Sequence, residues 1–428
     1  MAVDAGTSPA PANPAALNAT DTGTPGGTPA MMALPANITP LSADASSTRK
    51  FYTITAALRE TYDDNVNTAN TNPQSSFETM LSPSILVDFP KVDSDFSARY
   101  TFDLTLYTNR GQNNGGSGNN NNNNGGGSIE YTHEFVAQYT HTFSERFILN
   151  AAEQFRNYTE PSLFESTGTA YRSGAYISNI FNGTFNAQWT PLLGTTTTYS
   201  NTIIRYDDSQ TAATQNSIEN TASNNFNFAI LPKVSGGFGG IVDDITYETD
   251  MRGYTNYTAF AGVQWQILPS MSVVARGGGA YTEPVQAKAS LTPYAAFSFD
   301  WKLGARSELT FNYSHQVTPS DQVDANGQIS DQLSSNFRYD ITTSLSAHLQ
   351  GILTLSDTSQ SLTTSGTLSP GTLSSTTETV YALDTGLTYH YNSYLSFESG
   401  IILTGVTSNV SELEYTRDQA YVGVRGTY

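Results

Sequence analysis

The sequence contains no cysteine, which excludes a disulfide framework and thiolate metal sites but does not by itself fix the compartment. It also lacks any apolar run near the roughly 20 residues that a membrane helix needs, so insertion into a membrane would have to use strands. Met1 to Asp4 carry no basic region followed by an apolar core, so no secretory signal is visible. We interpret the sequence as a mature chain with an added methionine.

Charge is scarce as well. Only 13% of residues are charged, whereas a soluble chain typically has about a quarter. The 38 acidic and 19 basic residues give a net charge of -19, which argues against nucleic-acid binding and against docking on an anionic membrane surface, because both need clustered Lys and Arg. An acidic pore lining or acidic outer loops would explain this charge, and plain solubility explains it equally well.

Aromatic residues are abundant, with 25 Tyr and 21 Phe, a bias that suits strands and membrane interfaces better than helices. Residues 1–48 hold no aromatic residue and consist mainly of Ala, Pro, Thr, Gly and Ser, which predicts a disordered tail. From Phe51 onward, segments of roughly 10 to 16 residues alternate in polarity and end at turn residues. The chain is therefore predicted to comprise a periplasmic tail at 1–48 and one β domain at 49–428.

The alternation is clearest in the stretch that follows Ser94. One face there is apolar and the other is polar, with Phe96, Ala98, Tyr100, Phe102, Leu104 and Leu106 opposite Ser97, Arg99, Thr101, Asp103 and Thr105. Similar two-faced segments begin near Phe181, Leu309, Tyr381 and Leu395. The segment from Tyr381 to Tyr389 has a tyrosine near each end, which resembles an aromatic girdle around a lipid band.

Short turns alternate with longer polar loops, among them Asp207 to Ser217 and Thr318 to Gln328, as expected of membrane hairpins. Counting segments from Tyr52 to Tyr428 gives about 18 strands, with an uncertainty of about two. Two segments, Thr195 to Arg205 and Ile218 to Asn225, alternate poorly, and Pro83 and Pro293 would each remove a ladder donor. The predicted fold is an all-β, transmembrane, antiparallel up-and-down β-barrel with both ends on the periplasmic side.

The first strand ends in Tyr62-Asp63-Asp64-Asn65-Val66, and long Tyr-rich hairpins follow to a terminal aromatic residue. This pattern resembles the Putative beta-barrel porin 2 family of outer-membrane barrels, often linked with exopolysaccharide export, over roughly Phe51 to Tyr428. The last strand is similar to the signal by which barrels are recognised for assembly: Tyr428 supplies the closing aromatic residue and Gly423 the usual glycine. Gly426 departs from that pattern, where a larger apolar residue is expected.

Ionisable residues on the polar faces are the candidate functional residues. They are predicted to line the lumen and to set ion selectivity, and they comprise Arg99, Asp103, Glu130, Glu134, Arg276, Asp300, Glu308, Arg338, Asp340, Asp384 and Glu398. The alternative, equally weighted for any single residue, is that they pair and merely stiffen the wall. Acidic residues outnumber arginine in this set, which predicts a modest cation preference.

Catalytic chemistry is not visible. The Asn- and Gly-rich stretch from Gly111 to Gly127 lacks the Lys and the following helix of a phosphate-binding loop. No Ser, His and carboxylate set can be placed together by spacing, so no catalytic residue, cofactor or enzymatic activity is predicted. His348 and His390 could lie diagonally adjacent and hold a metal, but two neutral imidazoles in a wet lumen are the preferred interpretation.

Three hypotheses of function remain open at this stage. The first is an outer-membrane porin or channel that passes small hydrophilic solutes or exports polysaccharide. The second is a non-conducting barrel, plugged by its loops or tail, that acts as an anchor or adhesin, and the third is a soluble or secreted all-β protein. Expected partners are outer-membrane lipids, the barrel-assembly machinery and polysaccharide-export components; a homo-oligomer is open, and no sequence feature marks a protomer interface.

Overall fold

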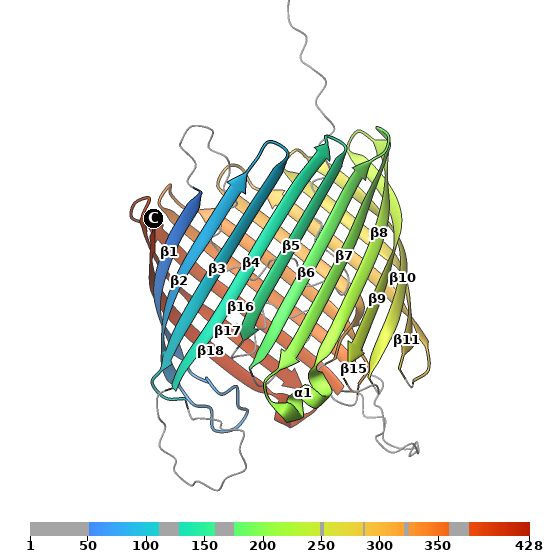
Figure 1. Cartoon of the computed structure of the whole chain (residues 1–428). Coiled ribbons are helices and arrows are strands. Elements are labelled where there is room, and N and C mark those ends of the chain that lie inside the picture. Colours follow the sequence, from blue (N-terminus) through green and yellow to red (C-terminus); the bar gives the residue numbers. More distant parts are fainter. Residues whose placement is uncertain are drawn as a thin grey trace, which may run out of the picture.

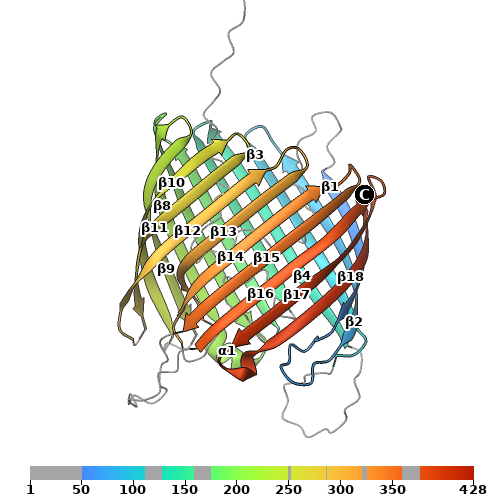
Figure 2. The ribbon, with the colours of Figure 1, turned by 180° about the vertical axis from the view of Figure 1, so that it is seen from behind.

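The computed structural model describes residues 51–110, 128–158, 175–248, 252–285, 287–320, 325–358 and 376–428, and the predicted tail at 1–48 lies outside them. These residues form one closed sheet (Figures 1 and 2). Each strand pairs antiparallel with its sequence neighbours, and the first pairs with the last, so the sheet has no free edge. The predicted number of 18 strands and the barrel class are confirmed.

The strands are long enough to cross a membrane at a tilt, since a tilted spanning strand needs about 9 to 11 residues. Their bounds are β1 Tyr52–Asp63, β2 Ser76–Pro90, β3 Ser94–Tyr107, β4 Ser128–Ser144, β5 Phe147–Tyr158, β6 Tyr176–Gln188, β7 Leu193–Tyr206, β8 Ser217–Leu231, β9 Val234–Tyr247, β10 Gly253–Leu268, β11 Met271–Pro284, β12 Ser290–Lys302, β13 Ser307–Thr318, β14 Gln328–Asp340, β15 Leu345–Thr358, β16 Thr376–His390, β17 Leu395–Ser408 and β18 Tyr415–Thr427.

Side chains alternate between the outer and inner faces of the wall. On β3, Phe96, Tyr100 and Leu106 are exposed on the outside, whereas Arg99 and Tyr107 are buried on the inside. Among the 18 strands, all except β5 contain at least one buried residue, and on β5 Arg156 pairs in register with the buried Glu134 and Ser178. The exposed apolar side chains therefore form the outer surface, as lipid contact requires.

Aromatic rings mark both ends of this outer surface. Phe51, Phe89 and Phe96 stack with centroids 6.4 Å apart at the end with the short turns. Tyr62 and Phe77 pack with centroids 5.3 Å apart at the opposite end of the same strands. Two aromatic bands that flank an aliphatic one are typical of a membrane-spanning barrel.

The two prolines inside strands lie where the ladder tolerates them. Pro83 occurs at a break in the β2–β3 register, between the pairs Leu81↔Leu104 and Ser84↔Thr101. Pro293 pairs with Gly279 on β11, but the β12–β13 ladder begins only at Ala295. Because each proline has no neighbour to bond on one side, the missing donor costs little.

The two ends of the barrel differ (Figures 1 and 2). Both chain ends of the sheet lie at the short-turn end, where Ile54 and Tyr428 exchange backbone hydrogen bonds of 3.0 and 2.8 Å. The opposite end carries the helix α1 (Ser209–Gln215), capped by the side chain of Asp208, and the short helix η1 (Ser411–Leu413). The prediction of a plain loop from Asp207 to Ser217 was therefore incomplete. In the described part of the chain no helix is long and apolar enough to cross a membrane.

Candidate functional site

All of the predicted lumen residues fall on the inward face of their strands. The register shows this directly, because Arg99 and Thr101 share a face with Glu134 and its partner Arg156, and Glu308 lies opposite Arg338. The inward set comprises Arg99, Asp103, Glu130, Glu134, Arg276, Asp300, Glu308, Arg338, Asp340, Asp384 and Glu398. Their effect on selectivity stays a prediction.

Several of these residues pair with one another or with a neighbour. Arg99 donates to Glu134 over 2.9 Å, and their side chains are only 10% and 6% exposed. Glu130 pairs with Arg110 over 2.8 Å. Arg338 lies 3.5 Å from Asp340, where both are well exposed and contribute little to stability. The alternative of mutual pairing thus holds for part of the set.

A second network joins strands across the closure of the barrel. Arg59 on β1 donates to Glu398 on β17 over 2.9 and 2.7 Å, reaching past β18 on the inner side. Arg425 on β18 lies 3.7 Å from the other oxygen of Glu398. The Arg59 guanidinium also lies 4.4 Å from the ring centroid of Tyr421. One carboxylate is therefore held between two arginines, which fixes positive and negative charge side by side on the wall.

Glycines make room for this network. A Cβ on Gly400 would lie 2.6 Å from the Tyr421 hydroxyl and 2.5 Å from a backbone oxygen, and one on Gly386 would meet the same hydroxyl at 2.8 Å. A Cβ on Gly423 would lie 2.9 Å from the Glu398 side chain. Gly423, predicted as part of an assembly signal, thus has a packing role in the wall; its role in assembly is untested, as is that of the exposed Tyr428.

Alternation alone did not single out Arg59, Tyr421 or Arg425 as functional. Arg59 does occupy the polar face of the first strand, in line with Thr55 and Asp63. Its place on the polar face could have identified Arg59 as a residue that faces the lumen. Its pairing with Glu398 depends on the register of β1 with β18, which relates chain positions 339 residues apart and leaves no local trace.

At the helix end of the barrel, Arg252 connects three segments. Its guanidinium donates to the carbonyl oxygens of Thr214 in α1 (2.7 Å), Ser320 (2.8 Å) and Ala325 (3.0 Å). It also lies 4.0 Å from the ring centroid of Tyr247. Ser320 and Ala325 belong to the connection between β13 and β14, and Val317 just before it packs against the inward Tyr247 and Tyr254, so the described part of this connection lies against the inner side of β9 and β10.

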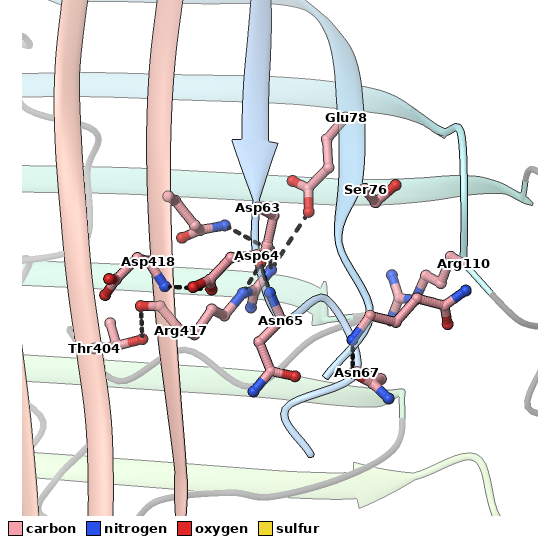
Figure 3. Close-up of polar contacts among 12 residues, drawn as sticks. Asp63, Asp64, Asn65, Asn67, Ser76, Glu78, Arg110, Thr404, Arg417 and Asp418 are labelled. Atoms are coloured by element: carbon pink, nitrogen blue, oxygen red, sulfur yellow. Dashed lines mark hydrogen bonds and ion pairs between the residues drawn. The ribbon is translucent and has the colours of Figure 1, made fainter. Parts of the chain in front are cut away.

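The Tyr62–Val66 motif lies at the same end of the barrel, on the seam between β1 and β18 (Figure 3). Asp63 is fully buried and forms an ion pair with Arg417, whose Nε donates over 2.6 Å. Arg417 also lies 3.4 Å from Glu78 on β2. Asn65 donates to the Thr416 carbonyl over 2.7 Å. The motif therefore fastens the first and last strands to each other.

Asp64 completes the seam from the exposed side. Its carboxylate accepts the backbone N–H of Asp418 over 2.7 Å (Figure 3), and its own N–H donates to the Asp418 carbonyl over 3.1 Å. Adjacent residues of the motif thus perform two tasks, because Asp63 neutralises a buried arginine and Asp64 extends the ladder.

The structure gives no support to a histidine metal site. His348 is 3.3 Å from Asp384, and His315 is 2.9 Å from Asp331. Across the described ranges no group of three or more His, Cys, Asp and Glu side chains could hold a metal ion.

Fold and inner wall define a class: a closed antiparallel barrel with an apolar exterior and an ionisable lumen. The model of the Putative beta-barrel porin 2 family matches residues 280–428, in agreement with the resemblance read from the sequence. The matched range includes β12 to β18 but not the Tyr62–Val66 motif. A search of curated proteins found no match.

Solved structures similar in outline include two siderophore receptors and another outer membrane protein. The siderophore receptor PiuA from Acinetobacter baumannii has 10% identity and a TM-score of 0.44, over 90% of this chain and 82% of that one. PirA from Pseudomonas aeruginosa, also a siderophore receptor, has 8% identity and a TM-score of 0.40, over 90% and 81%. The outer membrane protein opdK from Pseudomonas aeruginosa has 10% identity and a TM-score of 0.43, over 88% and 99%. None of these likenesses identifies a substrate for this chain.

Proposed function

We propose that the protein is a channel of the bacterial outer membrane, with both ends of the sheet on the periplasmic side. The observation that carries the proposal is the division of the wall: exposed apolar side chains cover the outside, and ionisable side chains of both signs line the inside. A polar lumen behind an apolar surface is what passive transport of hydrophilic solutes requires. Outer-membrane lipids and the barrel-assembly machinery are its proposed partners.

Planar-bilayer recording tests this function. The purified protein should give discrete ohmic current steps, and a salt gradient should show a modest cation preference, because acidic residues outnumber arginine among the predicted lumen residues. Silent bilayers, with protein shown to be inserted, would contradict the channel. Anion selectivity would contradict the proposed role of the acidic residues.

Two cargo classes fit this lumen, small hydrophilic solutes and an exported polysaccharide. Neutral dextran fragments added at the short-turn side separate them. Transient interruptions of the current, with entry rates that rise with fragment concentration, would support export through the lumen. An unblocked current would restrict the function to small solutes, and polysaccharide-export components would then cease to be expected partners.

A second candidate function is a plugged barrel that acts as an anchor or adhesin. The contacts of Arg252 at the helix end of the barrel favour it. These contacts hold Ser320 and Ala325, which belong to the connection between β13 and β14, against the inner side of β9 and β10. A plugged barrel predicts no current from the native protein but steps from a variant without these contacts.

A further inference from the structure

The outer face of strands β5 to β10 carries a row of polar side chains. The ladder register places one residue from each strand in line, and all of them except Phe181 are polar: Glu153, Phe181, Asn201, Asn220, Asp244 and Thr255. Tyr199 and Val242, two residues earlier on β7 and β9, are exposed on the same outer face. Because paired residues lie in line across the ladder, the row runs from the middle of β5 toward the helix end of β10.

Members of the row bond to one another or to Asn179, the outward residue two positions before Phe181 on β6. Asn179 donates to Glu153 over 2.7 Å, Asn201 donates to Asn220 over 2.9 Å, and Thr255 donates to Asp244 over 2.7 Å. In these bonds each carboxylate uses a single oxygen. Carboxylates and amides that face hydrocarbon are costly, and they are usually found where a membrane protein is covered by something other than lipid.

Small side chains border the polar row. The next outward row toward the short turns holds Ala151, Gly183 and Ala222 beside Tyr199. Below it, β7 and β8 present Thr197 and Asn224, both exposed. Small side chains project only a short way from the wall, so the backbone of another protein can approach closely. This part of the wall is therefore suited to contact with protein.

The opposite wall differs. On β14 to β17 the outward positions are mainly aliphatic or aromatic: Leu333, Phe337, Leu349, Leu353, Leu383, Leu387, Phe397, Ile401 and Leu403. Glu60 on β1 and Asp331 on β14 are outward carboxylates too. Glu60 is bonded to Thr79 over 2.6 Å between the exposed Leu58 and Tyr62, and Asp331 accepts from Tyr313 over 2.7 Å and lies 2.9 Å from His315, but neither has a row of amides beside it. The polar row therefore makes the outer surface asymmetric.

We propose that the outer wall of β6 to β8 is the interface between two copies of this chain in the membrane. An identical copy suits the row because each carboxamide carries a donor and an acceptor, so Asn201 and Asn220 can pair with the same residues of a second copy. A row of carboxylates alone would instead require a basic partner. The inference rests on the membrane placement of the proposed function and not on conduction.

The absence of cysteine permits a clean cross-linking test. Thr197→Cys and Ala222→Cys place a thiol on the polar wall, and Gly351→Cys and Ser399→Cys place one on the outward face of β15 and β17. Each variant is treated with a bis-maleimide in native outer membranes. Polar-wall variants should give several-fold more cross-linked product of twice the chain mass than the two controls.

Equal yields from both walls, no product from either, or products whose masses are not multiples of this chain would overturn the interface. Membrane fractionation and heat-modifiable migration of the same variants are recorded first. A soluble chain would refute the membrane channel itself, whereas an inserted barrel without specific cross-links refutes only the interface.

The double variant Asn201→Leu/Asn220→Leu separates an interface from a lipid-facing surface. Made in the Thr197→Cys background, it should lower the cross-linked fraction several-fold while the folded monomer persists, because leucine is favoured against lipid. Ser399→Leu in the same background is the control and should leave cross-linking unchanged. Undiminished cross-linking in the double variant would contradict pairing through the amides.

Discussion

At the scale of single residues, the barrel depends on charges buried in fixed pairs. Asp63 has no solvent exposure, and its partner Arg417 is nearly as buried. Removing one partner of such a pair leaves the other charge uncompensated, which is far more costly than losing an exposed pair. Arg99 with Glu134 follows the same logic deeper in the lumen.

Asp63→Asn should therefore lower the free energy of unfolding by about 3 kcal/mol, because the Arg417 guanidinium loses its counter-charge. The shift can be followed as heat-modifiable migration or by urea unfolding in vesicles. Asp418→Asn, at an exposed neighbour that bonds through its backbone, is the matched control and should change little. Equal shifts in the two variants would contradict the importance of the buried pair.

Gly400→Ala should destabilise the barrel by about 1 to 3 kcal/mol, since the new methyl group would collide with Tyr421 and with backbone. Adding Tyr421→Phe should recover part of this loss, because it removes one of the colliding atoms; a double-mutant cycle measures the coupling. Gly277→Ala is the control, because a Cβ there meets nothing within 4 Å. Comparable losses at Gly277 and Gly400 would refute the packing argument.

At the scale of elements, hairpin neighbours were predictable and long-range closures were not. The polar face of β3 showed Arg99 and Asp103 in the sequence, because alternation is local. Poor alternation over Thr195 to Arg205 is now explained by β7 having polar side chains on both faces, with Asn201 outside and Ser200 inside. The seam motif was visible as a pattern, but its partner Arg417 depends on closure of the sheet.

The contacts of Arg252 at the helix end also act at the scale of elements, because they connect α1 to the β13–β14 connection. Arg252→Ala removes the donor that joins Thr214 in α1 to Ser320 and Ala325 of the β13–β14 connection, so Ser320 and Ala325 should move away from the inner wall and single-channel conductance should rise. Arg205→Ala is a control at the same end of the barrel, because Arg205 bonds only to nearby carbonyls. An unchanged conductance in Arg252→Ala would show that these contacts of Arg252 do not limit the current.

At the scale of the whole molecule, the two faces of one closed sheet meet different surroundings, lipid outside and the lumen inside. The outer face presents mainly aliphatic and aromatic side chains to the lipid, and the inner face keeps ionisable groups hydrated or paired. The strand count and the inward set followed from sequence because both depend on a period of two. The contacts of Arg252 at the helix end did not, because they join loops that are distant in the chain.

A cysteine accessibility scan tests this division most directly. Leu349 and Gln350 are consecutive on β15, with Leu349 exposed on the outside and Gln350 turned inward opposite Asp384. In intact outer membranes, Gln350→Cys should react with a water-soluble maleimide and Leu349→Cys should stay protected until detergent is added, and Ser334→Cys and Leu333→Cys on β14 should repeat the contrast. Equal labelling of both members of each pair would contradict a water-filled lumen behind a lipid-facing wall.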